Sequence, residues 1–167
     1  MPQPAMISEN KVLLASLTAQ REHVLGILEG LSDEDLRRPV LPSGWSCLGL
    51  VRHLAIDVER FWFRSITAGQ QVEPRGSDAA VWQVAPDEPA ESVLGLYRRE
   101  IELADAIIAV TPLTAGPAWW PDEWPDWRFA DLRETMLHVI TETACHAGHL
   151  DAVRELIDGR TWLILTE

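Results

Sequence analysis

The sequence predicts an all-α protein: one four-helix bundle whose helices are joined by long connections. Apolar residues recur at helical spacing in four long stretches of the chain. Two other stretches, rich in proline, glycine and charged residues, are long for connections within a compact bundle. The length of 167 residues suits one domain with a substantial core. We therefore expect residues 1–167 to form a single four-helix-bundle domain.

The composition excludes several classes of protein. Apolar residues make up 47% and charged residues 24% of the chain, which is ordinary for a globular protein. The formal charge of −12 argues against a general nucleic-acid partner, because phosphate binding needs a basic surface. No apolar run is long enough to span a bilayer, and residues 1–11 lack the pattern of a secretory signal. Two cysteines give no disulfide framework, so the expected compartment is the cytoplasm.

The first helix is expected at residues 7–31, with Ser8 as its N-cap. His23 lies in this helix with no polar cluster near it in sequence, so we interpret it as a surface or hydrogen-bonded histidine. The segment 32–35 has the serine-plus-acid form of a helix start and can support one short helix. The apolar side of the first helix consists of Val12, Leu13, Leu17, Val24, Ile27, Leu28 and Leu31.

The second helix is expected at residues 47–68, after a turn and an N-cap in residues 42–46. His53 lies at the margin of its apolar side, and Asp57 follows one turn later. Taken alone, a histidine in this position is usually a hydrogen-bonded residue at the edge of a core. The inner side of the helix is made of Leu50, Val51, Leu54, Val58, Phe61, Trp62 and Ser65.

Residues 70–88 form the first long connection, which is typical either of a functional lid or of a simple crossing. The third helix is expected at residues 90–110. The second long connection, residues 111–129, contains four prolines that exclude a regular helix. Its tryptophans either anchor the loop on the bundle or form an apolar wall over a ligand pocket. These tryptophans are Trp119, Trp120, Trp124 and Trp127.

The fourth helix, residues 131–159, carries an unusual polar face. At about 100° per residue, four polar residues of this helix fall within an arc of about 80° beside its apolar stripe. They are His138, Glu142, His146 and His149, with Cys145 at the edge of the arc. Gly159 is a suitable C-terminal residue. The apolar tail that follows, residues 161–167, could be an extended segment over the bundle or a contact with a second subunit.

Metal ligation is the leading explanation of this face. Glu142 and His146 stand at i and i+4, so both side chains can reach one ion. His53 on the facing helix would supply a third ligand, and three protein ligands are typical of catalytic zinc sites. The set suits zinc first, and also nickel or ferrous iron. His149 could replace Glu142, which gives the alternative set His53, His146 and His149. A metal-free polar network is a further alternative.

Two stretches carry a resemblance to a known family. LGLVRHLAIDVERFWF (residues 48–63) and LRETMLHVITETACHAGHLDAVRELIDG (residues 132–159) resemble the DinB-like superfamily. More narrowly, they are similar to an uncharacterised actinobacterial-type branch related to the N-terminal domains of mycothiol-dependent maleylpyruvate isomerase. The resemblance implies an up-up-down-down bundle, a tendency to form homodimers, and a divalent metal held by His53, Glu142 and His146.

The resemblance also bears on activity. Most of the superfamily has histidine at the position of Glu142, and the branch with glutamate resembles the isomerase, whose additional C-terminal domain would not fit within 167 residues. Isomerase activity as such therefore does not follow from the resemblance. We expect thiol-transfer chemistry, in which a metal-bound thiolate of a low-molecular-weight, mycothiol-like thiol attacks an electrophilic small molecule. Alternatives are a metal-dependent hydrolase, a non-catalytic metal- or small-molecule-binding stress or resistance protein, and a purely structural polar face.

The remaining site residues have expected roles in this scheme. His149 or Asp57 would orient the metal ligands or move protons. Substrate binding is assigned to His138, Trp119, Trp120 and Trp124. Cys145 is an unlikely nucleophile, because no helix N-terminus lies near it to lower the pKa of its thiol.

Overall fold

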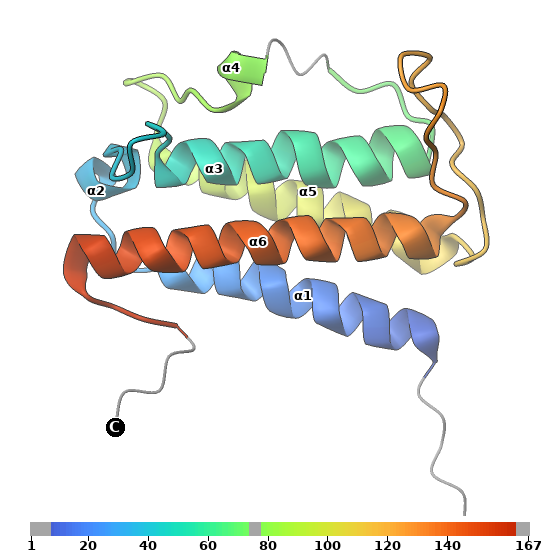
Figure 1. The fold of residues 1–167 in the computed structure, drawn as a ribbon, viewed down its shortest axis with the longest axis horizontal. Coiled ribbons are helices and arrows are strands. Elements are labelled where there is room, and N and C mark those ends of the chain that lie inside the picture. The colour runs from blue at the N-terminus through green and yellow to red at the C-terminus, as the bar shows by residue number, and fades with distance from the viewer. Residues whose placement is uncertain (1–7, 74–77, 163–167) are drawn as a thin grey trace, which may run out of the picture.

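The computed structural model describes residues 8–73 and 78–162 and is all-helical over those ranges (Figure 1). Four long helical rods form the bundle, as predicted, and two short helices lie outside it. In chain order the elements are α1 (Glu9–Leu28), α2 (Asp33–Arg37), α3 (Cys47–His53), η1 (Leu54–Thr67), α4 (Asp78–Val81), α5 (Ala90–Val110) and α6 (Leu132–Asp158).

Helices α1 and α6 pack side by side and run in the same direction. Near their first turns Arg133 Nη2 donates to Glu9 Oε2 at 3.1 Å, and near their last turns Arg154 Nη1 donates to the Ile27 carbonyl at 2.7 Å. Helix α3 continues directly into η1, and this rod runs opposite to α6 and parallel to α5 (Figure 1). The order of directions is therefore up-down-down-up, and the expected order, up-up-down-down, was wrong.

The connections explain this order. Helix η1 ends at one end of the bundle and α5 starts at the other, the same end as α3, so the connection described at residues 68–73 and 78–89 links opposite ends of the bundle (Figure 1). Residues 111–131 instead turn back at one end of the bundle, where the Leu132 N–H donates to the Ala115 carbonyl at 2.9 Å. An up-up-down-down bundle needs two crossing connections, whereas this chain uses the second long connection as a folded loop.

The helix ends follow the capping signals in the sequence. Ser32, Ser46 and Asp131 each accept a hydrogen bond from the backbone N–H three residues later, at 3.1 Å in each case. Helix α6 ends at Gly159, whose φ of 79° is the left-handed conformation that favours glycine. Ser8 occupies the N-cap of α1 without a side-chain hydrogen bond, and α1 ends three residues earlier than expected.

The second rod changes its winding after His53. Over Leu54–Thr67 the helix is π-helical; at its end, for example, the Ala68 N–H donates to the Phe63 carbonyl five residues earlier, at 3.0 Å. The extent of the rod matches the predicted residues 47–68, but the wider turns were not anticipated. The change of winding places His53 at the junction between the two forms.

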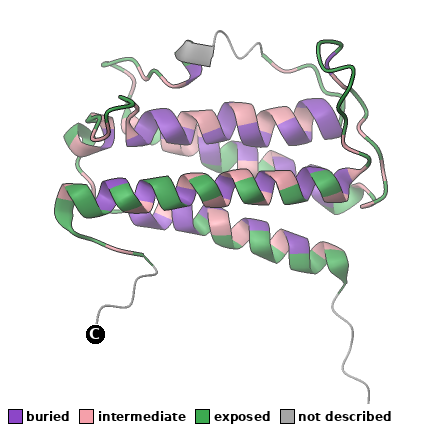
Figure 2. Cartoon of the chain, in the orientation of Figure 1, coloured by how far each residue is buried: buried purple, intermediate pink, exposed green. Residues whose placement is uncertain are grey.

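The core lies between the four rods, and most residues of α3 and η1 are buried (Figure 2). It also contains charged groups: Arg21 donates to both carboxylate oxygens of Glu59, at 2.7 and 2.6 Å. His23 is buried as well, with its Nε2 2.7 Å from Asp151 Oδ1, so of the two expected alternatives, a surface or a hydrogen-bonded histidine, the second holds. No helix among the described residues combines the length and apolar character that a bilayer crossing requires.

The C-terminal tail is described only at its start. Trp162 stacks on the ring of His23, with ring centroids 5.0 Å apart, and its indole fills the space beside Gly26. Residues 163–167 lie outside the described residues, so the predicted extended segment or subunit contact there stays a prediction.

Candidate metal centre

Three predicted ligands come together between the second rod and α6. His53 ends α3, and Glu142 and His146 lie one turn apart in the middle of α6. One ligand atom from each residue can be chosen so that all three atoms lie within 4.8 Å of one another. Because the rod formed by α3 and η1 runs antiparallel to α6, a residue in the first half of this rod can meet the middle of α6. The fold therefore brings together residues about 90 positions apart in sequence.

Asp57 fixes the orientation of His53. The two residues are one turn apart on the rod, and Asp57 Oδ2 lies 2.9 Å from His53 Nδ1. A carboxylate only accepts hydrogen bonds, so the ring proton resides on Nδ1 and the Nε2 lone pair is left for another partner. This carboxylate–histidine arrangement is common behind metal-binding histidines. On one face His53 stacks against Trp82, with centroids 4.3 Å apart and planes 15° from parallel.

His146 is held neutral by its surroundings. Burial lowers the pKa of His146 to about 4, and the nearby imidazole of His53 adds to the effect. Its Nδ1 is buried and has no hydrogen-bond partner among the described residues, while its Nε2 lies 3.3 Å from Glu142 Oε2. A neutral imidazole is the form that binds a metal. The arrangement therefore presents nitrogen and oxygen lone pairs at one place.

The donor set fits a divalent ion. Two ligands of a tetrahedral ion with bonds of about 2.0–2.1 Å lie roughly 3.3 Å apart, which equals the observed Glu142–His146 separation. The side chains are partly buried: His53 and His146 expose 16% and 14%, and Glu142 exposes 40%. Solvent or a substrate can thus approach from the Glu142 side.

The alternative ligand His149 stands outside this cluster. Its side chain is exposed, and its ring centroid lies 5.5 Å from that of His146. Among the described residues, the group with metal-binding spacing consists of His53, Glu142 and His146. Cys145, also on α6, is exposed, next in sequence to His146.

The other predicted site residues, one on α6 and three in the loop before it, lie in or beside an aromatic cluster that packs on η1. His138 packs edge-on against Trp62, with ring centroids 4.5 Å apart, and burial lowers the pKa of His138. Trp120 and Trp124 pack on Trp62, at 6.1 and 6.2 Å. This placement fits the anchoring interpretation of the proline-rich loop. The aromatic cluster consists of Phe61, Trp62, Trp119, Trp120, Trp124, Trp127 and Phe129.

Two tryptophans beside the metal centre were missed from the sequence. Trp82, in the long crossing connection, stacks on His53, and Trp45, just before α3, lies 6.2 Å from the ring of His149. A hollow of about 410 Å³ opens between them, lined by Ser43, Gly44, Trp45, Trp82 and Gln83. Neither tryptophan belongs to a stretch with helical periodicity, so the apolar pattern of the sequence did not indicate that it lies near the site. The one feature of the sequence that could have drawn attention to them is the high tryptophan content of eight residues.

The family of the chain follows from a comparison with known protein families. The sequence profile of the family described as Mycothiol-S-transferase matches residues 12–159, which covers both rods of the metal centre. The chain belongs to the mycothiol S-transferase family. This family is part of the DinB-like superfamily, so the predicted relationship is confirmed. The search of the curated proteins gave no match.

Membership of the mycothiol S-transferase family agrees with the expectation of thiol-transfer chemistry. It suggests transfer chemistry on the sulfur of a small thiol, and it implies small-molecule substrates. The metal, its ligands and the mechanism go beyond what family membership gives.

Proposed function

We propose that this protein is a divalent-metal-dependent S-transferase that joins a low-molecular-weight thiol to an electrophilic small molecule. The proposal is carried by the convergence of His53, Glu142 and His146, whose ligand atoms lie within 4.8 Å of one another. Membership of the mycothiol S-transferase family supports mycothiol as the thiol. Zinc suits the two imidazoles and one carboxylate, and nickel or ferrous iron would also fit.

The chain's own residues prepare the site for this reaction. His53 and His146 would bind the ion through neutral imidazole nitrogens, and Glu142 through a carboxylate oxygen. Asp57 holds the orientation of the His53 ring by accepting a hydrogen bond from its Nδ1–H. A bound divalent ion would lower the pKa of a coordinated thiol, so that sulfur is present as thiolate at neutral pH.

The hollow between Trp45 and Trp82 is our candidate for the electrophile site. It measures about 410 Å³, and one of its walls, Trp82, is in ring contact with His53. Two indoles provide an apolar surface that excludes water from a bound substrate. The expected role of His138, Trp119, Trp120 and Trp124 in substrate binding stays a prediction, as do the homodimer and the cytoplasmic location.

The reaction balances without a further reagent. The thiol loses its proton, the sulfur forms a bond to the electrophilic carbon, and a leaving group departs from that carbon with its electron pair. His149 is our candidate for carrying the proton to solvent, because its ring is exposed and lies 5.5 Å from His146.

The decisive experiment measures metal content. Untagged protein would be analysed by mass spectrometry beside the variants His53→Ala, Glu142→Gln, His146→Ala and His149→Ala. We expect about one equivalent of metal in the unaltered protein and in His149→Ala, and at least a tenfold loss of affinity in the other three. Metal retained in Glu142→Gln but lost in His149→Ala would select the alternative ligand set.

A second measurement separates catalysis from simple metal binding. The loaded protein would be mixed with mycothiol and 1-chloro-2,4-dinitrobenzene, and the absorbance of the thioether product followed. We expect product formation above the uncatalysed rate that disappears in His53→Ala. Stoichiometric metal without turnover of this or other electrophiles would make the protein a metal-binding protein and refute the transferase proposal.

A further inference from the structure

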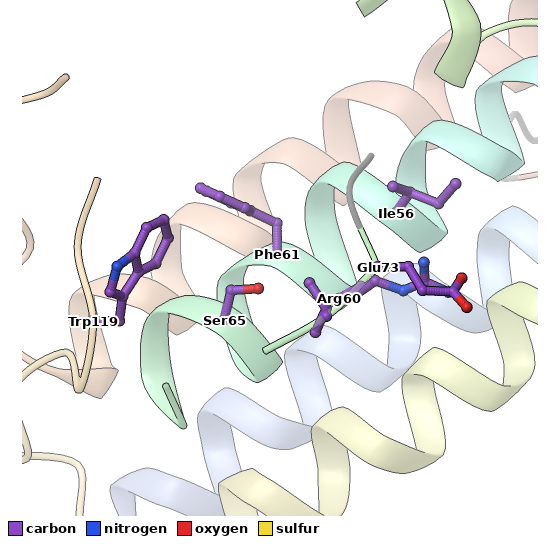
Figure 3. A pocket seen from close by; sticks show the side chains of 7 residues that line it. Ile56, Arg60, Phe61, Ser65, Glu73 and Trp119 are labelled. Atoms are coloured by element: carbon purple, nitrogen blue, oxygen red, sulfur yellow. The ribbon is translucent and has the colours of Figure 1, made fainter. Parts of the chain in front are cut away.

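A second cavity borders η1. It measures about 190 Å³ and lies between the rod, the start of the crossing connection and the loop that carries Trp119 (Figure 3). None of the three proposed metal ligands lines it. The lining residues are Ile56, Arg60, Phe61, Ser65, Val72, Glu73 and Trp119.

The cavity contains a buried hydroxyl group without a partner. Ser65 exposes only 6% of its surface, and its Oγ has no hydrogen-bond partner among the described residues. In Figure 3 the hydroxyl lies between Trp119 and Arg60, on the cavity wall. A serine inside a helix commonly bonds to a carbonyl one turn earlier, but Ser65 does not. Since a buried hydroxyl without a partner costs free energy, this one is suited to bond with an occupant of the cavity.

The aromatic walls are held in place by the backbone. The N–H groups of Ala118 and Trp119 both donate to the Ile66 carbonyl, at 3.0 and 3.2 Å. The Trp119 ring stands at 88° to that of Phe61, with centroids 6.4 Å apart. These two rings form a corner, and the aliphatic side chains of Ile56 and Val72 complete an apolar surface. Such a surface suits a flat, apolar ring.

The charges around the cavity are balanced. Arg60 donates from Nε and Nη2 to Glu100 Oε1, at 3.0 and 2.9 Å, and Arg64 donates to both oxygens of the same carboxylate. Glu73 adds a second carboxylate at the cavity. Among the described residues, two guanidinium groups and two carboxylates therefore lie at or beside the cavity, and their charges cancel. A neutral occupant is favoured.

We propose that this cavity binds a small neutral molecule with one aromatic ring and one hydroxyl group, the ring in the corner of Phe61 and Trp119 and the hydroxyl bonded to Ser65. The site is separate from the metal centre and does not depend on the proposed transferase activity. Its ligand class follows from the apolar corner, the unpaired hydroxyl and the balanced charges.

Phenol and toluene test this proposal, because they have the same size and differ in one hydroxyl group. Each would be titrated into isotope-labelled protein, and the indole N–H signal of Trp119, assigned with Trp119→Phe, would be followed by NMR. We expect saturable phenol binding with a Kd on the order of 1 mM or tighter. Ser65→Ala should lower the phenol-to-toluene affinity ratio about three- to tenfold.

A second test fills the cavity with a larger side chain. Val72→Phe should weaken both probes at least tenfold, whereas the matched control Val110→Phe, at a position 81% exposed on α5, should change neither. His53→Ala should leave phenol affinity unchanged, which separates this site from the metal centre. The proposal is overturned if Trp119 shows no saturable shift, if Ser65→Ala leaves the ratio unchanged, or if Val72→Phe behaves like Val110→Phe.

Discussion

At the scale of single residues, the two cysteines occupy opposite environments. Cys47 begins α3, exposes 1% of its surface, and burial raises the pKa of its thiol to about 11. Cys145 is exposed on α6. Because the thiolate is the reactive form, burial and a raised pKa both protect Cys47. Neither cysteine is required by the proposed chemistry, so both can report on the folded state.

We expect one thiol to react rapidly with a chromogenic disulfide reagent at pH 8 in the native protein, and two in denaturant. In Cys145→Ser the rapid phase should be absent, whereas Cys47→Ala should keep it. Thiol titration by absorbance measures the counts directly. Two rapidly reacting thiols in the native protein would contradict the burial of Cys47.

At the scale of secondary-structure elements, the crossing connection packs closely on α3 through a glycine. A Cβ at Gly49 would overlap the carbonyl oxygen of Trp82, so glycine lets the connection approach the helix. This contact places the Trp82 indole on His53. The position of an aromatic wall of the metal centre therefore depends on a missing side chain in α3.

Gly49→Ala should push Trp82 away from His53. We expect the overlap to lower the free energy of unfolding by about 1–3 kcal/mol and to weaken the affinity of the proposed site for metal. The matched control is Gly95→Ala in α5, where the added Cβ meets no described atom within 4 Å outside its own stretch of helix, and we expect it to stabilise the protein by about 0.5–1 kcal/mol. Chemical denaturation and metal titration of both variants measure the effects. Equal stability of the two variants would refute the close packing.

The long helices and several of their ends could be predicted from the sequence. Ser32, Ser46 and Gly159 marked helix ends because capping is local chemistry. The spacing of Glu142 and His146 placed both on one helical face. Trp82 escaped prediction, because the position of an irregular connection depends on tertiary packing. The π-helical winding of η1 escaped as well, since its apolar pattern also fits an α-helix.

At the scale of the whole molecule, a buried ion network joins three of the four rods. Arg21 on α1 contacts Glu59 on η1, with exposures of 3% and 0%, and Asp105 on α5 at 2.7 Å. Burial raises the pKa of Glu59, an effect that the Arg21 charge opposes. The sequence did not reveal this network or the order of helix directions, because both depend on which rods become neighbours.

Arg21→Met should destabilise the bundle by about 3–5 kcal/mol, since it leaves the buried Glu59 carboxylate without its partner. The matched control is Arg98→Met, which breaks a surface pair with Glu91 and should cost less than about 1 kcal/mol. Thermal melting compares the two. The double variant Arg21→Met/Glu59→Met should regain most of the lost stability, and equal melting temperatures for the two single variants would rule out the network as a source of stability.

The stack of Trp82 on His53 also gives the protein an optical signal of its own. An indole in ring contact with an imidazole changes its emission when a cation binds that imidazole, and a paramagnetic ion such as Co²⁺ quenches emission at short range. The tryptophans of the aromatic cluster lie toward the other end of η1, so they form a separate background. Comparison with Trp82→Phe isolates the local signal, so binding of an ion at the proposed site would be followed in real time without a label.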